Sequence, residues 1–276
     1  MHFGATLRLL RIDSGLSLRD LARRLRVSSA YLSRVEKGLD AAPTPARLAD
    51  VAKELEVPAT LLMDLAQRIS PLVVDYVERV PDAGSLFLEI AHRNLNAAQL
   101  AEVRAMLDER FPVARPAGLP RGAALADLLA PERIVLGLSG ASMEDVLDLA
   151  AGRLAESLPG TDAVSLARLL RASEAEVSSA IGGGIAVPCG YVSGVGALAA
   201  VVVLNEALHY DTPDGQPLRA VMVLLGPRDD PGRRLVLARI AGLAARGMAE
   251  ALAGAQSAEE AYRWITHQSY LPLDVR

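Results

Sequence analysis

The segment Val27–Gly38, which reads VSSAYLSRVEKG, constrains the fold of the N-terminal part most strongly. Ser28 can cap a helix start, because its hydroxyl accepts a hydrogen bond from a free backbone N–H of the first turn. Tyr31, Leu32 and Val35 recur at helical spacing and would face a core. The opposite face carries small side chains first and cations further along: Ser29, Ala30, Ser33, Arg34 and Lys37. Such a helix can enter a DNA major groove, although any amphipathic helix with a solvated basic face shows the same pattern.

The flanking segments predict four more helices. The first covers residues 3–11 and is ended by Gly15, a typical C-terminal glycine. Ser17 can cap the second, from Leu18 to Leu25. Residues 43–46, which read PTPA, open a fourth helix that runs through Glu54. The fifth follows residues 57–60 and begins at about Leu61.

This order of helices, with LSLRDLARRL, VSSAYLSRVEKG and PTPARLADVAKELEV in register, resembles the lambda-repressor-like (XRE) helix-turn-helix family. The resemblance covers about a quarter of the chain and implies binding to double-stranded operator DNA. It implies that bases are read by Ser29, Ala30 and Ser33. Ser28, which caps the same helix, is also expected to belong to the DNA-binding residues. The resemblance further implies contacts with the DNA backbone by Ser17, Arg19, Arg34 and Lys37.

Two positions depart from that family. Leu18 stands where many members have a Gln that bonds a phosphate and braces the reading helix. Arg26 stands where many have a glycine in the turn, so we expect either a mildly strained turn or an added phosphate contact. Because the readers are Ser and Ala, we expect modest sequence discrimination through direct hydrogen bonds.

The charge distribution supports a DNA-binding domain fused to a different one. The chain of 276 residues has a net charge of −4, which by itself gives no indication of nucleic acid. Residues 1–69 hold 11 Lys and Arg against 8 Asp and Glu, a net charge of +3, whereas the remainder carries −7. The single cysteine excludes an intrachain disulfide and favours a reducing compartment. No signal peptide is evident, so we expect a cytoplasmic protein.

One stretch tests the prediction of a protein without membrane segments. Residues 177–205 carry no formal charge and are numerous enough to span a bilayer. They contain six glycines and Pro188, which fit two buried strands joined by a loop better than one helix.

The region after the head is predicted to be helical. Residues 72–79, 83–93 and 96–111 have apolar positions at helical spacing, and we interpret residues 70–111 as a connector that packs on the head or forms a dimer interface. A homodimer on a palindromic site is expected, because one small module makes too few DNA contacts. Pro and Gly cluster in residues 112–123, the predicted linker.

The C-terminal part alternates between helices and apolar strands. Strands are predicted at residues 134–138, 184–189, 197–204 and 218–225, and helices at residues 142–158, 162–170, 233–252 and 258–266. This alternation indicates an α/β layered domain, with a mixed sheet flanked by helices, in a multidomain chain whose N-terminal part is all-α.

Three segments of residues 124–270 resemble the phosphotransferase-system IIA domain of the fructose/mannitol type. They read ADLLAPERIVLGLSGASMEDVLDLAAGRLAE, SSAIGGGIAVPCG and LNEALHYDTPDGQPLRAVMVLLGPRDD. In that family a histidine that carries a phosphoryl group follows the proline, and Cys189 stands there in this chain. The Arg usual beside a Glu is replaced by Ser173, before Glu174, and a second histidine is replaced by Arg234.

These replacements indicate a catalytically degenerate domain kept for regulation. We predict a transcriptional regulator, not an enzyme, without cofactor or metal, whose C-terminal domain senses a small molecule or a phosphotransferase-system protein. Such a ligand would shift the population of DNA-competent states. Two alternatives stay open: a phosphocarrier that accepts phosphate on Cys189, and an antitoxin-like protein-interaction module. A reactive Cys189 would need a thiol pKa lowered by Arg234 or by a helix N-terminus.

Overall fold

The computed structural model describes residues 2–66, 71–111, 124–158 and 160–268. The N-terminal domain, called the head below, consists of α1 to α5. Their bounds are α1 (Phe3–Asp13), α2 (Leu18–Arg24), α3 (Ser29–Glu36), α4 (Pro45–Leu55) and α5 (Ala59–Leu65). The predicted order of five helices is confirmed, and the fifth begins two residues earlier than expected. The predicted linker, residues 112–123, lies outside the described residues.

The helix starts follow from local side-chain chemistry. Ser17, Ser28 and Thr44 each accept a hydrogen bond from the backbone N–H three residues further on, at the first turns of α2, α3 and α4. Each such cap contributes about 1 kcal/mol to helix stability. Arg26 joins α2 to α3 with φ of 54°, so the strained turn expected at this position is present.

The head has its own apolar core. Leu32 and Val35 of α3 are buried, and Tyr31 packs partly buried against the same cluster, as the helical spacing predicted. Gly4 of α1 lies against the backbone of α3, where an added Cβ would come within 2.2 Å of the Val35 carbonyl oxygen. Glycine is therefore required for the close approach of α1 and α3.

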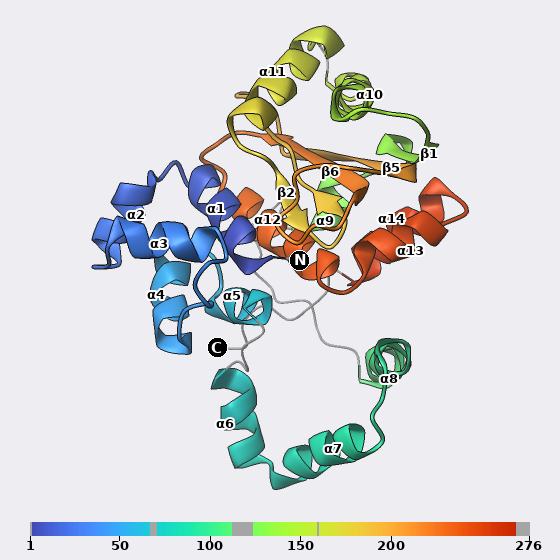
Figure 1. The fold of residues 1–276 in the computed structure, drawn as a ribbon. Helices are drawn as coiled ribbons and strands as arrows, with labels where there is room; N and C mark the ends of the chain where they lie inside the picture. The colour runs from blue at the N-terminus through green and yellow to red at the C-terminus, as the bar shows by residue number, and fades with distance from the viewer. Residues whose placement is uncertain (1, 67–70, 112–123, 159, 269–276) are drawn as a thin grey trace.

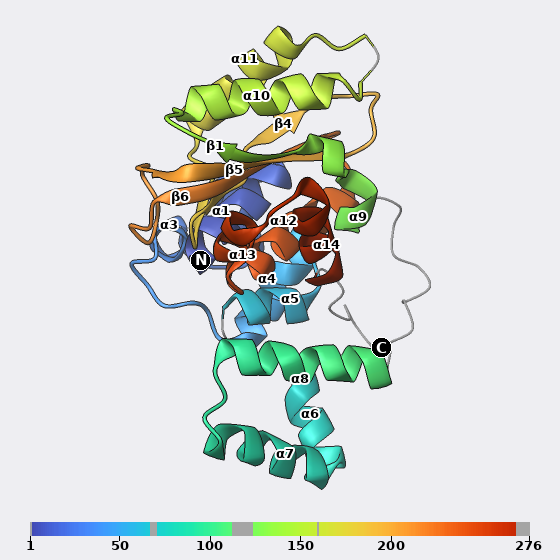
Figure 2. The same ribbon diagram turned by 90° about the vertical axis from the view of Figure 1, so that its right-hand side faces the viewer.

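Three helices follow the head and form the connector: α6 (Pro71–Arg79), α7 (Pro81–His92) and α8 (Ala97–Arg110). The helices predicted there are confirmed. They lie away from the head and from the α/β domain in both views (Figure 1 and Figure 2), and α6 packs against α7.

In the described part of the C-terminal domain, six strands form a mixed sheet. Their bounds are β1 (Ile134–Leu138), β2 (Ala180–Gly182), β3 (Ile185–Ala186), β4 (Cys189–Tyr191), β5 (Leu198–Leu208) and β6 (Leu218–Gly226). The strand order is β1-β5-β6-β3-β2, and β4 also pairs with β6. The pairs β5–β6 and β2–β3 are antiparallel, whereas β1–β5, β3–β6 and β4–β6 are parallel.

Helices cover both faces of this sheet, as Figure 2 shows. One face carries α10 (Met143–Ala155) and α11 (Ala163–Glu176), and the other carries α12 (Pro231–Ala244), α13 (Met248–Gly254) and α14 (Ala258–Gln268). The short helices α9 (Leu125–Leu128) and η1 (Pro131–Arg133) precede β1. The α/β layered domain is therefore confirmed.

Successive residues of β5 enter the two cores alternately, because strand side chains point to opposite faces in turn. Val201 and Val203 belong to the cluster under α12, and Val202 belongs to the cluster under α10. The predicted helix 233–252 is two helices, and Gly247, with φ of 82°, caps the second.

The uncharged stretch 177–205 holds β2, β3, β4 and the first part of β5, more strands than the two expected from its glycines. Among the described residues, no helix combines the length and apolarity that crossing a bilayer requires.

The head packs directly on the α/β domain. Helices α1 and α5 contact α12, and α1 also contacts β2. One apolar cluster runs from Leu7 and Leu62 of the head to Val236 and Ile240 of α12. Figure 1 shows α1 and α5 beside α12.

Candidate nucleic-acid interface and the C-terminal pocket

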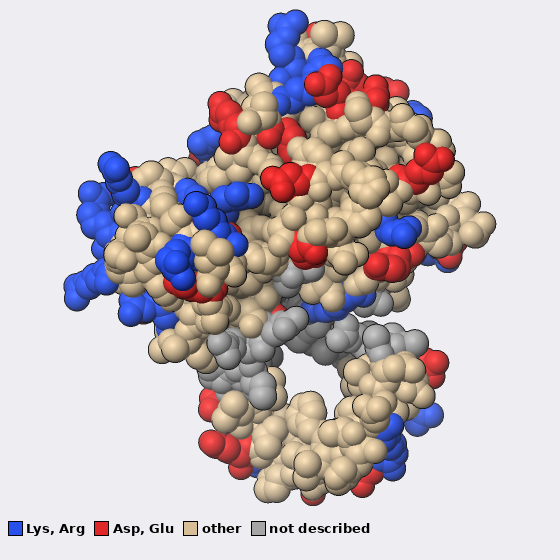
Figure 3. All heavy atoms as spheres, viewed as in Figure 1, with Lys and Arg blue, Asp and Glu red and all other residues tan. Residues whose placement is uncertain are grey.

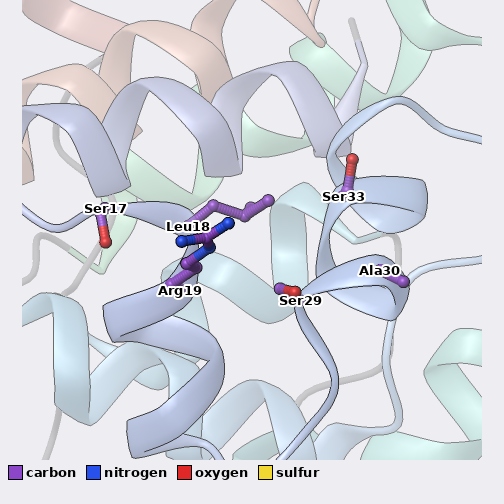
Figure 4. Close-up of a pocket in the computed structure, with 6 residues that line it drawn as sticks. All are labelled: Ser17, Leu18, Arg19, Ser29, Ala30 and Ser33. Atoms are coloured by element: carbon purple, nitrogen blue, oxygen red, sulfur yellow. The ribbon is translucent and has the colours of Figure 1, made fainter.

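An open hollow of about 490 Å³ lies between the start of α2 and the start of α3 (Figure 4). The residues that line it come from two positions in the sequence that the turn at Arg26 brings together: Ser17, Leu18, Arg19, Ser29, Ala30 and Ser33. Of the five that the sequence assigned to DNA contacts, four are exposed and Ser33 is half-buried. Leu18, which departs from the family pattern, contributes an apolar side chain to the same hollow.

The two other expected contacts with the DNA backbone lie further along α3. Lys37 is exposed at the C-terminal end of the helix. Arg34 is exposed too, but its guanidinium pairs with Asp40, at 2.7 Å from Nη2 to Oδ1. A phosphate at this position would therefore replace Asp40 as the partner of Arg34.

Cations gather over this part of the molecule. Figure 3 shows Lys and Arg side chains clustered on the outer surface of the head, whereas acidic groups are frequent on the α/β domain. The exposed cations of α2, α3 and the turn between them are Arg19, Arg23, Arg24, Arg26, Arg34 and Lys37. A surface of this charge attracts phosphates.

A buried ion pair holds α3 against α1. Arg11 donates two parallel hydrogen bonds to Glu36, at 2.6 Å from Nε to Oε1 and 2.8 Å from Nη2 to Oε2. A third bond from Arg11 reaches the carbonyl of Leu16, just before α2. The last turn of α1 therefore fixes both helices that border the hollow.

The second candidate site is the cluster of side chains around Cys189 in the α/β domain, which includes Glu174 and is called the C-terminal pocket below because related domains carry their active site there. Glu174 is buried in α11, where one carboxylate oxygen accepts bonds from Ser179 N–H at 3.0 Å and from the Tyr210 hydroxyl at 2.6 Å. Its negative charge acts on the thiol of Cys189 at the start of β4. Ser173, next to Glu174, is half-buried on α11.

The surroundings of Cys189 disfavour nucleophilic chemistry. The thiol donates to the carbonyl of Val187 at 3.5 Å. Burial raises its pKa to about 11, and the attraction of Arg233 only partly offsets that effect. The thiol is therefore protonated at neutral pH, whereas attack on a phosphoryl group requires the thiolate.

The cation whose charge acts on the Cys189 thiol is Arg233, whereas the sequence suggested Arg234. The Arg233 side chain is fully buried and acts on the thiol, whereas Arg234 pairs with Glu56 of the head. Successive residues of a helix point about 100° apart. Arg233 therefore faces Cys189 and Arg234 does not, although the charges of both arginines act on Asp13. The sequence could not show which arginine faces the thiol, because α12 is buried on nearly all sides.

A carboxylate from the head completes this pocket. Asp13, at the end of α1, accepts from Arg233 Nε at 2.7 Å, and the Tyr191 hydroxyl donates to it at 3.4 Å. Arg228 and Arg233 both lie over the Tyr191 ring, at 4.0 and 4.7 Å from its centroid. Sequence reasoning missed these four residues. A signal existed for Asp13, because a carboxylate in the last turn of a helix opposes the helix dipole and needs a cation nearby.

Comparison with known proteins agrees with both parts of this architecture. Residues 2–65 match the family described as "Helix-turn-helix domain", and residues 127–268 match the one described as "Phosphoenolpyruvate-dependent sugar phosphotransferase system, EIIA 2". The molecule is thus a helix-turn-helix domain joined to an α/β domain of the phosphotransferase IIA class. The chain belongs to the EIIA 2 family of the phosphoenolpyruvate-dependent sugar phosphotransferase system.

Similar proteins align with the C-terminal half. A nitrogen regulatory protein of Pseudomonas aeruginosa is 33% identical over 144 residues, which are 51% of this chain and 94% of that protein. One from Bradyrhizobium diazoefficiens is 31% identical over 121 residues, 43% of this chain and 78% of that protein. The crystal structure of nitrogen regulatory protein IIA-Ntr from Neisseria meningitidis is 30% identical and covers 51% of this chain and 99% of its own, with a TM-score of 0.47.

Proposed function

We propose that this protein is a DNA-binding transcriptional regulator of the XRE type, whose catalytically degenerate IIA-like domain senses a ligand or a partner. The observation that carries the DNA-binding role is the exposed hollow between α2 and α3. It combines hydroxyls and a cation at the N-terminal ends of two helices, within a surface rich in arginine. Helix N-termini, hydroxyls and arginines are the groups that contact phosphates and base edges.

The residues proposed to contact DNA form two groups, one for the base edges and one for the DNA backbone. Ser29, Ala30 and Ser33 would read base edges, at the start of the helix that Ser28 caps. The others would contact the DNA backbone: Ser17, Arg19, Arg34 and Lys37. Because the readers are short, we expect a large share of the affinity to come from phosphate contacts and to fall steeply with salt.

The protein would act as a homodimer on a palindromic operator. Most large apolar side chains that are exposed among the described residues belong to the connector; only Leu39 and Val164 lie elsewhere. Those of the connector are Val73, Val74, Tyr76, Val80, Leu86, Phe87, Leu88, Leu100, Met106, Leu107 and Phe111. An apolar surface of this extent is typical of a protein interface, and a second connector is chemically equivalent to it.

A regulatory role of the IIA-like domain, without enzymatic activity, is supported by the surroundings of its pocket. The phosphoryl-accepting histidine is absent, the thiol at its position is held protonated, and the pocket contains a carboxylate of the head. The relatives named nitrogen regulatory proteins agree with a role in regulation. We propose that Ser173, Glu174, Cys189 and Arg234 mark the degenerate site of this domain, as the resemblance to the family implies.

The proposed function is tested by selecting DNA from a random pool with the full-length protein, followed by a salt titration of the selected sequence. We expect a palindrome whose affinity falls steeply as salt rises. Arg19→Ala should weaken binding about tenfold, because a phosphate contact is lost. Arg168→Ala, which removes an exposed arginine from α11 of the other domain, is the matched control and should leave affinity unchanged. Recovery of no sequence above background would refute DNA binding and favour a protein-interaction module.

A further inference from the structure

Arg233 is a cation without solvent contact. Its side chain is 0% exposed, and its guanidinium donates to the carbonyl oxygens of Gly190 and Leu224, at 3.2 and 3.3 Å, besides the Nε bond to Asp13. The two carbonyls come from its own domain and carry no net charge. Among the described residues, Asp13 is the carboxylate that balances this buried charge.

Asp13 fits this position incompletely. Its side chain is only 1% exposed, yet its second carboxylate oxygen, Oδ2, has no hydrogen-bond partner among the described residues. The charge of Arg234 also acts on Asp13. The Nε atom of Arg234 is buried and has no hydrogen-bond partner among the described residues. An unpaired buried acceptor and an unpaired buried donor each cost free energy.

The burial of Asp13 is also costly by itself. Its pKa is raised from the usual range, chiefly because burial disfavours the charged carboxylate, and Arg233 only partly offsets that effect. A contact of this kind is released more easily than a fully satisfied ion pair.

We propose that Arg233, Arg234 and Tyr191 form a binding site for a small oxyanion, such as phosphate or a carboxylate, which Asp13 occupies while the head is docked. An oxyanion can accept hydrogen bonds from both arginines, including the donor that Asp13 leaves unpaired. The anion and Asp13 exclude one another, because both need the Arg233 guanidinium. The site would bind the ligand that the proposed regulatory function requires, and it defines that ligand as an oxyanion. The inference therefore rests on the proposed function.

Displacement of Asp13 would loosen the head. Besides Asp13–Arg233, the polar contacts between the two domains include Arg234 with Glu56, Arg8 with the carbonyl of Ser178, and His2 N–H with the carbonyl of Ile181. An anion that engages both arginines competes with the two ion pairs among these contacts. By thermodynamic linkage, the docked head must weaken anion binding by the same factor by which the anion weakens docking.

The anion would change DNA binding by altering the position of the head, and not by uncovering the face that is proposed to read DNA. Ser29, Ala30 and Arg19 are exposed while the head is docked, so the α/β domain does not cover the reading face. A head released from α12 is free to change its separation from the second head of a dimer, and that separation must match the half-sites. Arg11, two residues before Asp13, connects the same turn of α1 to α3.

The test measures phosphate affinity calorimetrically with the full-length protein, at constant ionic strength with chloride as the reference salt. Asp13→Asn keeps the shape and removes the competing charge, so it should bind phosphate at least tenfold more tightly than the wild type. Asp50→Asn, at an exposed position of the same domain, is the matched control and should behave as the wild type. Acetate in place of phosphate decides whether the site prefers a phosphate or a carboxylate.

A double variant, Asp13→Asn with Arg233→Gln, keeps a neutral pair in the pocket and should lose phosphate binding. Hydrogen exchange of wild-type α1 should quicken when phosphate is added, because the head is released. Unchanged phosphate affinity in Asp13→Asn, or phosphate binding with unaltered exchange in α1, would overturn the inference. The DNA affinity of the same variants separates the two proposals: DNA binding without a gain in phosphate affinity refutes only the anion site. A gain in phosphate affinity without any DNA binding refutes only the regulator.

Discussion

Asp13 and Arg233 are 220 positions apart in the sequence and form an ion pair of 2.7 Å with almost no solvent exposure. The same turn of α1 carries Arg11, which forms a bidentate pair with Glu36 of α3. One helical turn therefore contacts both the C-terminal pocket and the helix proposed to read DNA. This arrangement gives a physical route from the pocket to the reading helix, through two ion pairs and one rigid helix.

The Arg11–Glu36 pair should be required for the stability of the head. Glu36→Gln leaves the buried Arg11 charge without its carboxylate, so we expect the free energy of unfolding to fall by about 3 kcal/mol. DNA affinity should fall as well, because α3 is no longer fixed against α1. Chemical denaturation followed by circular dichroism measures the first effect. Glu54→Gln, which removes a carboxylate from the more exposed pair with Arg24, should change stability by less than about 1 kcal/mol. Equal effects of the two substitutions would contradict this role of the buried pair.

The close approach of α1 to α3 should make Gly4 intolerant of a side chain. An alanine Cβ would lie 2.2 and 2.6 Å from the carbonyl oxygens of Val35 and Glu36, so Gly4→Ala must push the two helices apart. We expect a loss of about 2 kcal/mol, typical of overpacking, and a lower melting temperature. Gly152→Ala in α10 has no atom within 4 Å and should be neutral or stabilising by up to about 1 kcal/mol. If the two variants had the same melting temperature, the helix propensity of alanine alone would explain the effect, and the close approach of α1 to α3 would not be needed.

Cys189 should alkylate slowly at neutral pH. Burial raises its pKa from 9.0 to about 11, so its thiolate fraction at pH 7 is about 100-fold smaller than that of a solvent-exposed thiol with the usual pKa. The rate of reaction with iodoacetamide should keep rising with pH up to about 11 in the folded protein. The same protein unfolded in urea is the control and should level off near pH 9. A folded-state rate that levels off below pH 8 would instead reveal a reactive thiol and revive the phosphocarrier alternative.

The connector should mediate dimerisation. Leu88 of α7 is 61% exposed, and Leu88→Glu places a charge within the apolar surface proposed as the interface. Sedimentation equilibrium should show a shift from dimer to monomer, and DNA affinity should fall because only one head binds. Val164→Glu alters an apolar residue of similar exposure, 59%, on the α/β domain and should leave the dimer intact. A wild-type protein that sediments as a monomer would exclude the connector as a dimer interface.

Local sequence signals determined most of the secondary structure. The caps at Ser17, Ser28 and Thr44, and the apolar spacing of α3, depend on contacts within a few residues, and the structure contains all of them. The apolar runs of β1, β5 and β6 likewise indicated strands, because a short run rich in aliphatic side chains is typical of a strand buried on both faces. Five of the six residues that line the hollow are ones that the resemblance to a helix-turn-helix family assigned to DNA contacts, and local signals define the starts of the helices that carry them.

Tertiary structure alone decided how the two domains meet. Nothing near Asp13 in the sequence identifies Arg233 as its partner, and the choice between Arg233 and Arg234 depended on the rotation of a helix that is buried nearly all round. Contacts over such separations arise from the packing of complete domains, which no short sequence window contains. The sequence therefore determined two domains and the face proposed to read DNA, whereas only the folded chain showed that a carboxylate of the first domain occupies the pocket of the second.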